Sequence, residues 1–181
     1  AVASNITHSV DARGNTTPAS AISDISFSII PAMGLSPSSG AVGTSVTVSG
    51  LGFGASETGI KVTFDGTDAI SSISATSNGT WSGTFIVPAA ASGSHIIDAS
   101  GNITSAASVG NASFTVTPKI TLGKENGPPG TSVGVTGTGF AANETGINVT
   151  YDGVQVGAAV TANSKGGWST SFNIPDSPTG P

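Results

Sequence analysis

The sequence predicts an all-β chain of tandem antiparallel β-sandwiches with an 87-residue period. Apolar and polar residues alternate, as in Val46-Thr-Val48 and Phe114-Thr-Val116, which is the period of a strand with one buried face. Dipeptides such as Asp65-Gly66 interrupt these runs and are typical of tight hairpin turns. In addition, 27 of the 63 positions in residues 32–94 are identical to the position 87 residues later. We find no amphipathic helix.

The repeat sets the expected domain organisation. Gly43-Thr-Ser-Val46 recurs as Gly130-Thr-Ser-Val133, and Glu57-Thr-Gly-Ile60 recurs as Glu144-Thr-Gly-Ile147. The N-terminal residues keep the same phase, because His8 corresponds to His95. We therefore expect three parts: residues 1–31 as the last two strands of a unit, completing a neighbouring unit; residues 32–118 as a complete β-sandwich; and residues 119–181 as the first five strands of a unit, to be completed by residues equivalent to 1–31.

The complete unit is expected to contain seven short strands, which is typical of an antiparallel sandwich. Trp81, Phe85 and Phe114 are predicted to lie in its core. The predicted strands are near 33–36, 45–51, 60–65, 69–75, 81–87, 95–100 and 113–117.

Composition excludes several function classes. Only 8% of the residues are charged and the net charge is -5, so no basic patch is available to bind a nucleic acid. The absence of cysteine excludes disulfides, thiolate metal sites and cysteine nucleophiles. No apolar run is long enough to span a bilayer. The sequence thus predicts no nucleic-acid partner and no membrane span.

No catalytic or metal-binding constellation is predicted. His95 and Asp98 are three residues apart on a strand, which sends their side chains to opposite faces. Asp65 and Asp68 offer oxygens to calcium, but the second copy has Asp152 and Gln155, so a repeated site is not supported. We therefore expect a non-enzyme without a cofactor, with calcium at domain junctions left open.

Several segments carry a family resemblance. Pro37–Phe53, followed by Val62-Thr-Phe-Asp-Gly66, resembles the start of the IPT/TIG-type immunoglobulin-like repeat, and Gly127–Phe140 resembles it more closely. Trp81–Pro88 and Gly93–Ala99 are similar to tandem repeats of archaeal and bacterial surface proteins. The resemblance implies an extracellular or cell-surface location. It identifies a fold more than a function, because such sandwiches serve stalks, adhesins and filaments alike.

N-glycosylation sequons are the strongest chemical signal. Seven of ten asparagines begin Asn-x-Ser/Thr, where about three are expected by chance. We predict N-linked glycans on several of them, although a chain rich in Asn, Ser and Thr also produces idle sequons. The sequon asparagines are Asn5, Asn15, Asn78, Asn102, Asn111, Asn143 and Asn148.

The two incomplete units predict self-association. The first and last parts would each expose strand edges and apolar faces that need a partner. We expect a structural protein of an extracellular filament, sheath or surface-layer or stalk array, joined by strand complementation between subunits or forming part of a longer covalent repeat. The alternative is an adhesin or carbohydrate-binding module. The residues expected on the joining strands are Ile6, Val10, Phe27, Ile29, Phe140, Val149, Tyr151, Trp168 and Phe172.

Overall fold

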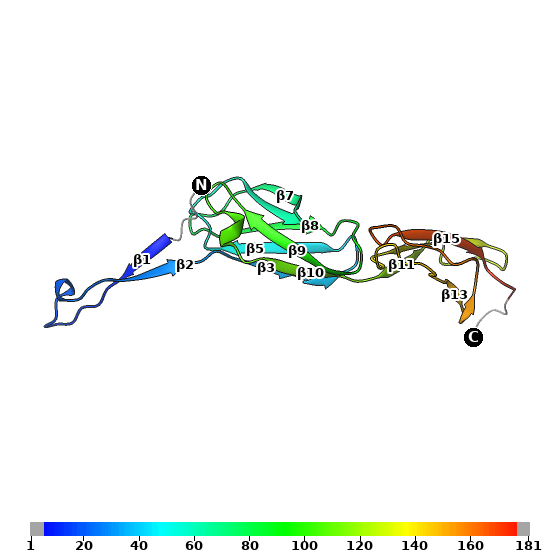
Figure 1. Cartoon of the computed structure of the whole chain (residues 1–181), viewed down its shortest axis with the longest axis horizontal. Helices are drawn as coiled ribbons and strands as arrows, with labels where there is room; N and C mark the ends of the chain where they lie inside the picture. Colours follow the sequence, from blue (N-terminus) through cyan, green and yellow to red (C-terminus); the bar gives the residue numbers. More distant parts are fainter. Residues whose placement is uncertain (1–5, 177–181) are drawn as a thin grey trace. The chain divides into compact units, whose positions relative to one another are not determined.

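The structure is a computed structural model that describes residues 6–176 (Figure 1). In this part the chain is all-β, with fifteen strands and two short 3-10 helices. Nearly all strand pairs are antiparallel. The pairing of β4 with β10 is parallel.

The first part is a hairpin. Strand β1 (Ile6–Val10) pairs antiparallel with β2 (Ile25–Ile29), and Val10 faces Ile25. The connection between them contains the 3-10 helix η1 (Ala19–Ala21). Residues 6–29 are called the N-terminal hairpin from here on.

The central repeat, residues 32–118, is a sandwich of two sheets. One sheet has the order β3-β5-β8 and the other the order β4-β10-β9-β6-β7. The helix η2 (Ala106–Ser108) lies between β9 and β10. The bounds are β3 (Ala32–Ser36), β4 (Ser39–Gly40), β5 (Ser45–Leu51), β6 (Ile60–Phe64), β7 (Thr67–Ile73), β8 (Trp81–Ile86), β9 (Gly93–Ser100) and β10 (Ala112–Val116).

Alternation along the strands builds the core of the central repeat. In β5 every second residue is buried, beginning at Val46, while the residues between them face solvent. Asp65 and Gly66 both have positive φ, which makes the sharp turn between β6 and β7 that the sequence predicted. The seven expected strands are present, and β4 and η2 are additional elements. The buried apolar residues include Val46, Val48, Ile60, Val62, Phe64, Trp81, Phe85, Ile97, Phe114 and Val116.

The C-terminal part, residues 119–176, has its own small core. Strands β11 (Lys119–Leu122), β12 (Ser132–Thr138) and β15 (Trp168–Asn173) form one sheet. The pair β13 (Thr150–Tyr151) and β14 (Val154–Gln155) is much shorter than its counterpart β6 and β7. In the central repeat β6 also pairs with β9, and among residues 119–176 nothing corresponds to β9. A strand held on one side only forms fewer ladder bonds, which accounts for the short pair.

Candidate assembly interface

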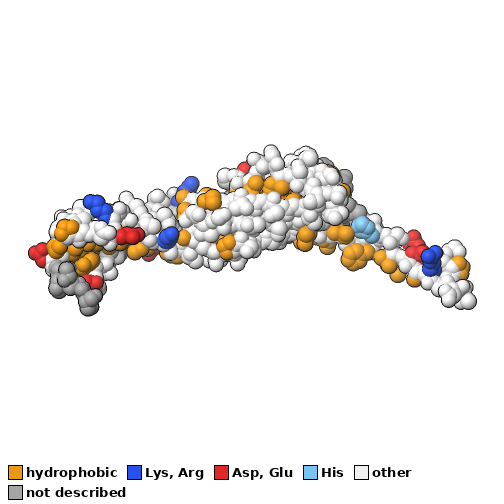
Figure 2. Space-filling model, turned by 180° about the vertical axis from the view of Figure 1, so that it is seen from behind, with side chains coloured by type: hydrophobic (Ala, Val, Ile, Leu, Met, Phe, Trp, Pro, Cys, Tyr) orange, Lys and Arg blue, Asp and Glu red, His pale blue; other side chains and the backbone are white. Residues whose placement is uncertain are grey.

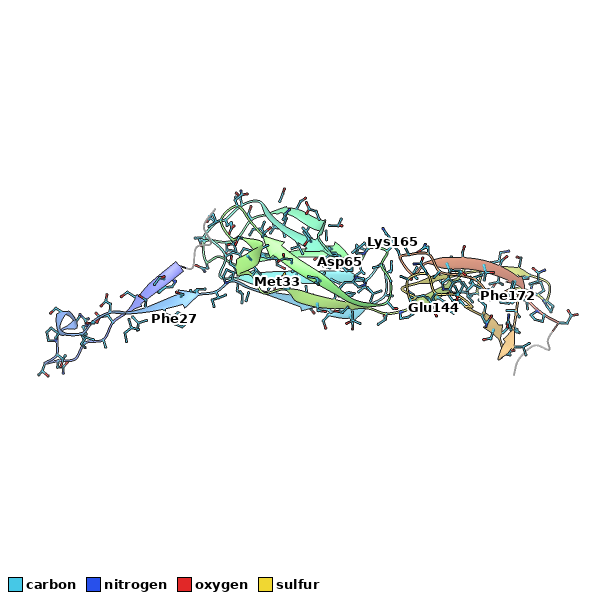
Figure 3. The ribbon with its side chains drawn as sticks, in the orientation of Figure 1. Phe27, Met33, Asp65, Glu144, Lys165 and Phe172 are labelled. Carbon is cyan, nitrogen blue, oxygen red and sulfur yellow. The ribbon has the colours of Figure 1, made fainter. Side chains whose placement is uncertain are left out.

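Apolar side chains of the N-terminal hairpin are exposed although their counterparts in the central repeat are buried. Phe27 is 63% exposed, whereas Phe114 is 0% exposed, and Val10 is 56% exposed, whereas Ile97 is 0% exposed. Orange side chains follow the hairpin at the right of Figure 2, and the Phe27 side chain stands out from β2 in Figure 3. The hairpin therefore presents the side chains of a sandwich core on a surface.

The hairpin already has the local conformation of its counterpart. The amide of Gly14 donates to the Thr17 carbonyl at 2.9 Å, and that of Gly101 donates to the Thr104 carbonyl at 2.8 Å. Helices η1 and η2 likewise occupy equivalent positions, each closed by a backbone bond from the residue that follows it. The connection between β1 and β2 thus has the conformation of its counterpart in the central repeat, although the apolar side chains of the hairpin are exposed.

A hollow of about 230 Å³ opens in the C-terminal part. Val133, Tyr151 and Phe172 line its apolar wall, and Figure 3 shows Phe172 on β15. Tyr151 and Phe172 are half-buried, whereas their counterparts Phe64 and Phe85 are buried. The hollow therefore exposes residues that form core in the central repeat.

The polar rim of this hollow corresponds to the segment that binds β10. In the central repeat the amides of Thr115 and Thr117 donate to the carbonyls of Ser38 and Gly40 at 3.0 and 2.9 Å. The equivalent segment, residues 125–127, lines the hollow of the C-terminal part. We call this rim together with Val133, Tyr151, Phe172 and Ile174 the acceptor surface. By phase, the strand that corresponds to β10 on this surface is β2.

A buried carboxylate joins two distant loops of the central repeat. The side chain of Glu57 is 1% exposed. Its Oε1 accepts hydrogen bonds from the amides of Ile103 and Thr104, both at 2.7 Å. Its Oε2 accepts from the Gly54 amide at 2.8 Å and from the Thr104 hydroxyl at 2.7 Å. All four acceptor positions of the carboxylate are therefore used.

These bonds decide the ionisation of Glu57. Desolvation by burial raises its pKa, and the hydrogen bonds from the backbone and hydroxyl of Thr104, followed by those from Ile103 and Gly54, lower it. The lowering prevails, and the pKa of Glu57 lies below its ordinary value of 4.5. The carboxylate is thus charged in the folded repeat at neutral pH, and it ties the loop after β5 to the loop after β9.

The counterpart Glu144 has one of these four contacts. Its Oε2 accepts from the Ala141 amide at 3.0 Å, which matches the bond from Gly54 to Glu57. The side chain is exposed, and within residues 6–176 no other donor reaches its carboxylate. Sequence reasoning missed this pair, although a glutamate kept in both copies of a chain with so few charges was an available signal.

The predicted glycosylation sites are on the surface. Asn15, Asn78, Asn102, Asn111, Asn143 and Asn148 are all exposed, and Asn5 lies outside the described residues. One sequon has a second explanation. The hydroxyl of Thr104, which completes the sequon of Asn102, is buried against Glu57. The threonine of the Asn102 sequon is therefore also required for packing in the central repeat.

The tryptophans lie in the cores. Trp81 is 5% exposed and packs edge to face on Phe53, and Trp168 is 8% exposed and packs in the same way on Phe140. Within the part of the chain that the structure describes, their indole N–H groups find no hydrogen-bond partner. Neither tryptophan offers an exposed ring face on which a sugar would stack.

The remaining residues proposed for the joining strands differ in their exposure. Ile29 is exposed on β2, whereas Phe140 and Val149 are half-buried and pack against the small C-terminal core. Trp168 belongs to that core itself. The side chain of Ile6 lies outside the described residues.

The two residues that were weighed as an acid and base pair each contact the backbone. His95 Nε2 contacts the Ala91 carbonyl at 2.8 Å, and the Asp98 carboxylate accepts from the amide of Ala99. Residues 6–176 contain no group of three or more His, Cys, Asp or Glu side chains that could hold a metal ion. Of the helices in this span, none has the length and apolar character needed to cross a membrane.

A comparison with family models agrees with the sandwich of the central repeat. Residues 32–116 match the IPT/TIG domain model. No curated protein sequence matches the chain. Two structures of alpha-2-macroglobulin from Escherichia coli, trypsin-activated and native, are 17% identical, with TM-scores of 0.37 and 0.35. The alignments cover 80% of this chain but only 13% and 12% of those proteins. Residues 32–116 are accordingly an immunoglobulin-like domain of the IPT/TIG family.

Proposed function

We propose that this chain is a structural protein of an extracellular filament, sheath or surface array, in which immunoglobulin-like sandwiches are joined head to tail. The observation that carries the proposal is the exposure of Phe27 and Val10, whose counterparts Phe114 and Ile97 are fully buried. Burying one such side chain contributes about 1.5–3 kcal/mol, so a hairpin that carries several of them favours a partner.

The acceptor surface is the proposed binding site for such a hairpin. Its half-buried Tyr151 and Phe172 correspond to Phe64 and Phe85, which are buried in the central repeat. A hairpin in the phase of β1 and β2 therefore fits there, and a contact between different surfaces at the two ends of a unit propagates as a linear array. Such a hairpin comes either from another molecule or from the same, longer polypeptide, and both arrangements give a string of sandwiches.

The exposed asparagines of the sequons support an extracellular location. Chains of low charge that present strand edges associate readily, and N-linked glycans at these positions would restrict association to the intended surfaces. The adhesin alternative receives no support from Trp81 or Trp168, because both are buried.

Electron microscopy of the native material, combined with the intact mass of the SDS-dissociated chain, tests the proposal. We expect fibres or sheets. A chain of about the 17.4 kDa of this sequence plus glycans indicates complementation between subunits, and a far heavier chain indicates a covalent array. Dispersed single particles in the native material would contradict the proposed function.

A matched pair of variants tests the surfaces directly. In the 181-residue chain, Phe27→Ser is expected to raise the concentration needed for assembly more than roughly 100-fold, because it removes a large side chain from the completed core. Val154→Ser changes an apolar residue that is 69% exposed and lies outside the acceptor surface, and it is expected to leave assembly unchanged. Sedimentation velocity gives the assembled fraction, and equal behaviour of the two variants would refute the role of the hairpin.

A further inference from the structure

The loop that carries Glu144 has the same backbone hydrogen bonds as the loop that carries Glu57. The Glu144 amide donates to the Ala141 carbonyl at 3.3 Å, as the Glu57 amide donates to Gly54 at 3.1 Å. The carbonyls of Glu57 and Glu144 each accept a bond of 2.8 Å, from Ala75 and Ala162 respectively. The loop that holds the carboxylate is therefore the same in both copies. What differs is the second loop, which in the central repeat supplies three donors from Ile103 and Thr104.

The N-terminal hairpin contains that second loop. Residues 14–17 occupy the phase of residues 101–104, and both segments close with the same backbone bond between their first and fourth residues. Thr17 keeps the hydroxyl of Thr104, whereas Thr16 replaces Ile103, which contributes only its amide. Both threonines are exposed. Every donor that Glu57 receives from the second loop is thus present, uncovered, in the hairpin.

A glycine requirement points to the same contact. A side chain at Gly101 would collide with Oε1 of Glu57, so the carboxylate needs a residue without Cβ at that position. Gly14 keeps the glycine, although around it the nearest heavy atom to an added Cβ is 4.0 Å away. Within the described residues nothing requires a glycine there, and a carboxylate packed against it would.

We propose, building on the function above, that the Glu144 carboxylate of one molecule is bound by the amides of Thr16 and Thr17 and the hydroxyl of Thr17 of a second copy of the chain, and that this contact sets the register of the joint. A slip of one residue turns the apolar face of β2 outward. A slip of two residues keeps that face but buries the carboxylate without its donors, which is strongly unfavourable. Only the aligned register satisfies both the core and the charge.

Two variants of the full chain test this contact, and both leave the separate molecule intact. Glu144→Gln changes an exposed side chain, and Gly14→Ala adds a methyl group where the separate hairpin has room. Each is expected to raise the concentration for half-assembly roughly 10- to 100-fold, since hydrogen bonds to a charged group are lost or blocked. Asn15→Gln, which removes the neighbouring sequon and leaves the donors, is the control and is expected to assemble as the unmodified chain does.

The register is read by cross-linking, for which the cysteine-free chain is suited. Thr115 and Ser39 are partners in the central repeat, so Ser28→Cys and Asn126→Cys are expected to form an intermolecular disulfide in the aligned joint. Ile30→Cys with Asn126→Cys reports a slip of two residues. When Glu144 is kept, we expect a disulfide from the aligned pair and none from the slipped pair. When Glu144→Gln is added, we expect the disulfide yield of the slipped pair to rise.

The outcomes separate this inference from the proposed function. If the unmodified chain assembles and Glu144→Gln and Gly14→Ala assemble equally well, the carboxylate contact is refuted while strand complementation stands. If Glu144→Gln weakens assembly but cross-linking stays confined to the aligned pair, the contact stands and its role in register is refuted. If the unmodified chain stays monomeric at every concentration, complementation between copies fails, and the carboxylate contact fails with it.

Discussion

Glu57→Gln is the sharpest test of how the central repeat is held together. The carboxylate accepts four hydrogen bonds, and an amide keeps one oxygen that can accept two of them. With the oxygen toward Ile103 and the Thr104 amide, the new NH₂ faces the Thr104 hydroxyl and the amide of Gly54. The hydroxyl can turn to accept from the NH₂, whereas the Gly54 amide is left without an acceptor. One orphaned amide and the loss of charge from the remaining bonds cost about 2–4 kcal/mol.

The chain contains its own control for this variant. Glu144→Gln removes the charge from an exposed side chain with one hydrogen bond, and it is expected to cost less than about 0.5 kcal/mol in the dispersed chain. Urea unfolding at a concentration below assembly measures both, with the fluorescence of Trp81 in a Trp168→Phe background for Glu57→Gln and that of Trp168 in a Trp81→Phe background for Glu144→Gln, so that each variant is followed in its own part of the chain. If Glu57→Gln shifts the unfolding midpoint no more than Glu144→Gln does, the buried carboxylate does not hold the two loops together.

Three further predictions follow from the same structure. Because folding lowers the pKa of Glu57, the stability that Glu57 contributes to the central repeat is complete above pH 4.5 and is lost as the pH falls through the lower folded pKa. A thermal midpoint of the central repeat that stays constant from about pH 6 to about pH 2.5 would contradict this. Gly50→Ala is expected to cost about 1–3 kcal/mol because its Cβ would collide with the indole of Trp81, whereas Gly134→Ala meets open space; equal urea midpoints would show that the indole yields. The native chain is expected to exceed its bare mass of 17.4 kDa through glycans on exposed sequons, and an intact mass equal to the bare value would remove glycosylation.

The strands and turns of the central repeat could be predicted because they depend on residues that are close together in the chain. The alternation around Val46 and Phe114 and the turn at Asp65-Gly66 are set by residues close together in the chain, so the strands of the central repeat lie near their predicted positions. The 87-residue repeat likewise predicts from the sequence alone that Phe27 and Val10 belong to the candidate interface. These are properties of periodicity and steric preference, and they can be read along a single sequence.

Other features depended on partners that are distant in the chain. Glu57 and Thr104 are 47 residues apart, and the sequence offered Thr104 only as the last residue of a sequon. The short pair β13 and β14 could not be anticipated from residues almost identical in pattern to β6 and β7, because strand length there depends on whether a neighbour such as β9 is present.

The sequence by itself therefore determined the all-β class, the repeat, the strands and the apolar faces, because each of these follows from the order of neighbouring residues. Only the tertiary structure decided which donor forms a hydrogen bond with which acceptor. The burial of Glu57 and the exposure of Glu144, two residues with the same local sequence, follow from whether a second loop arrives with its donors. A buried charge is stable only where such donors converge, and their convergence is a property of the folded chain.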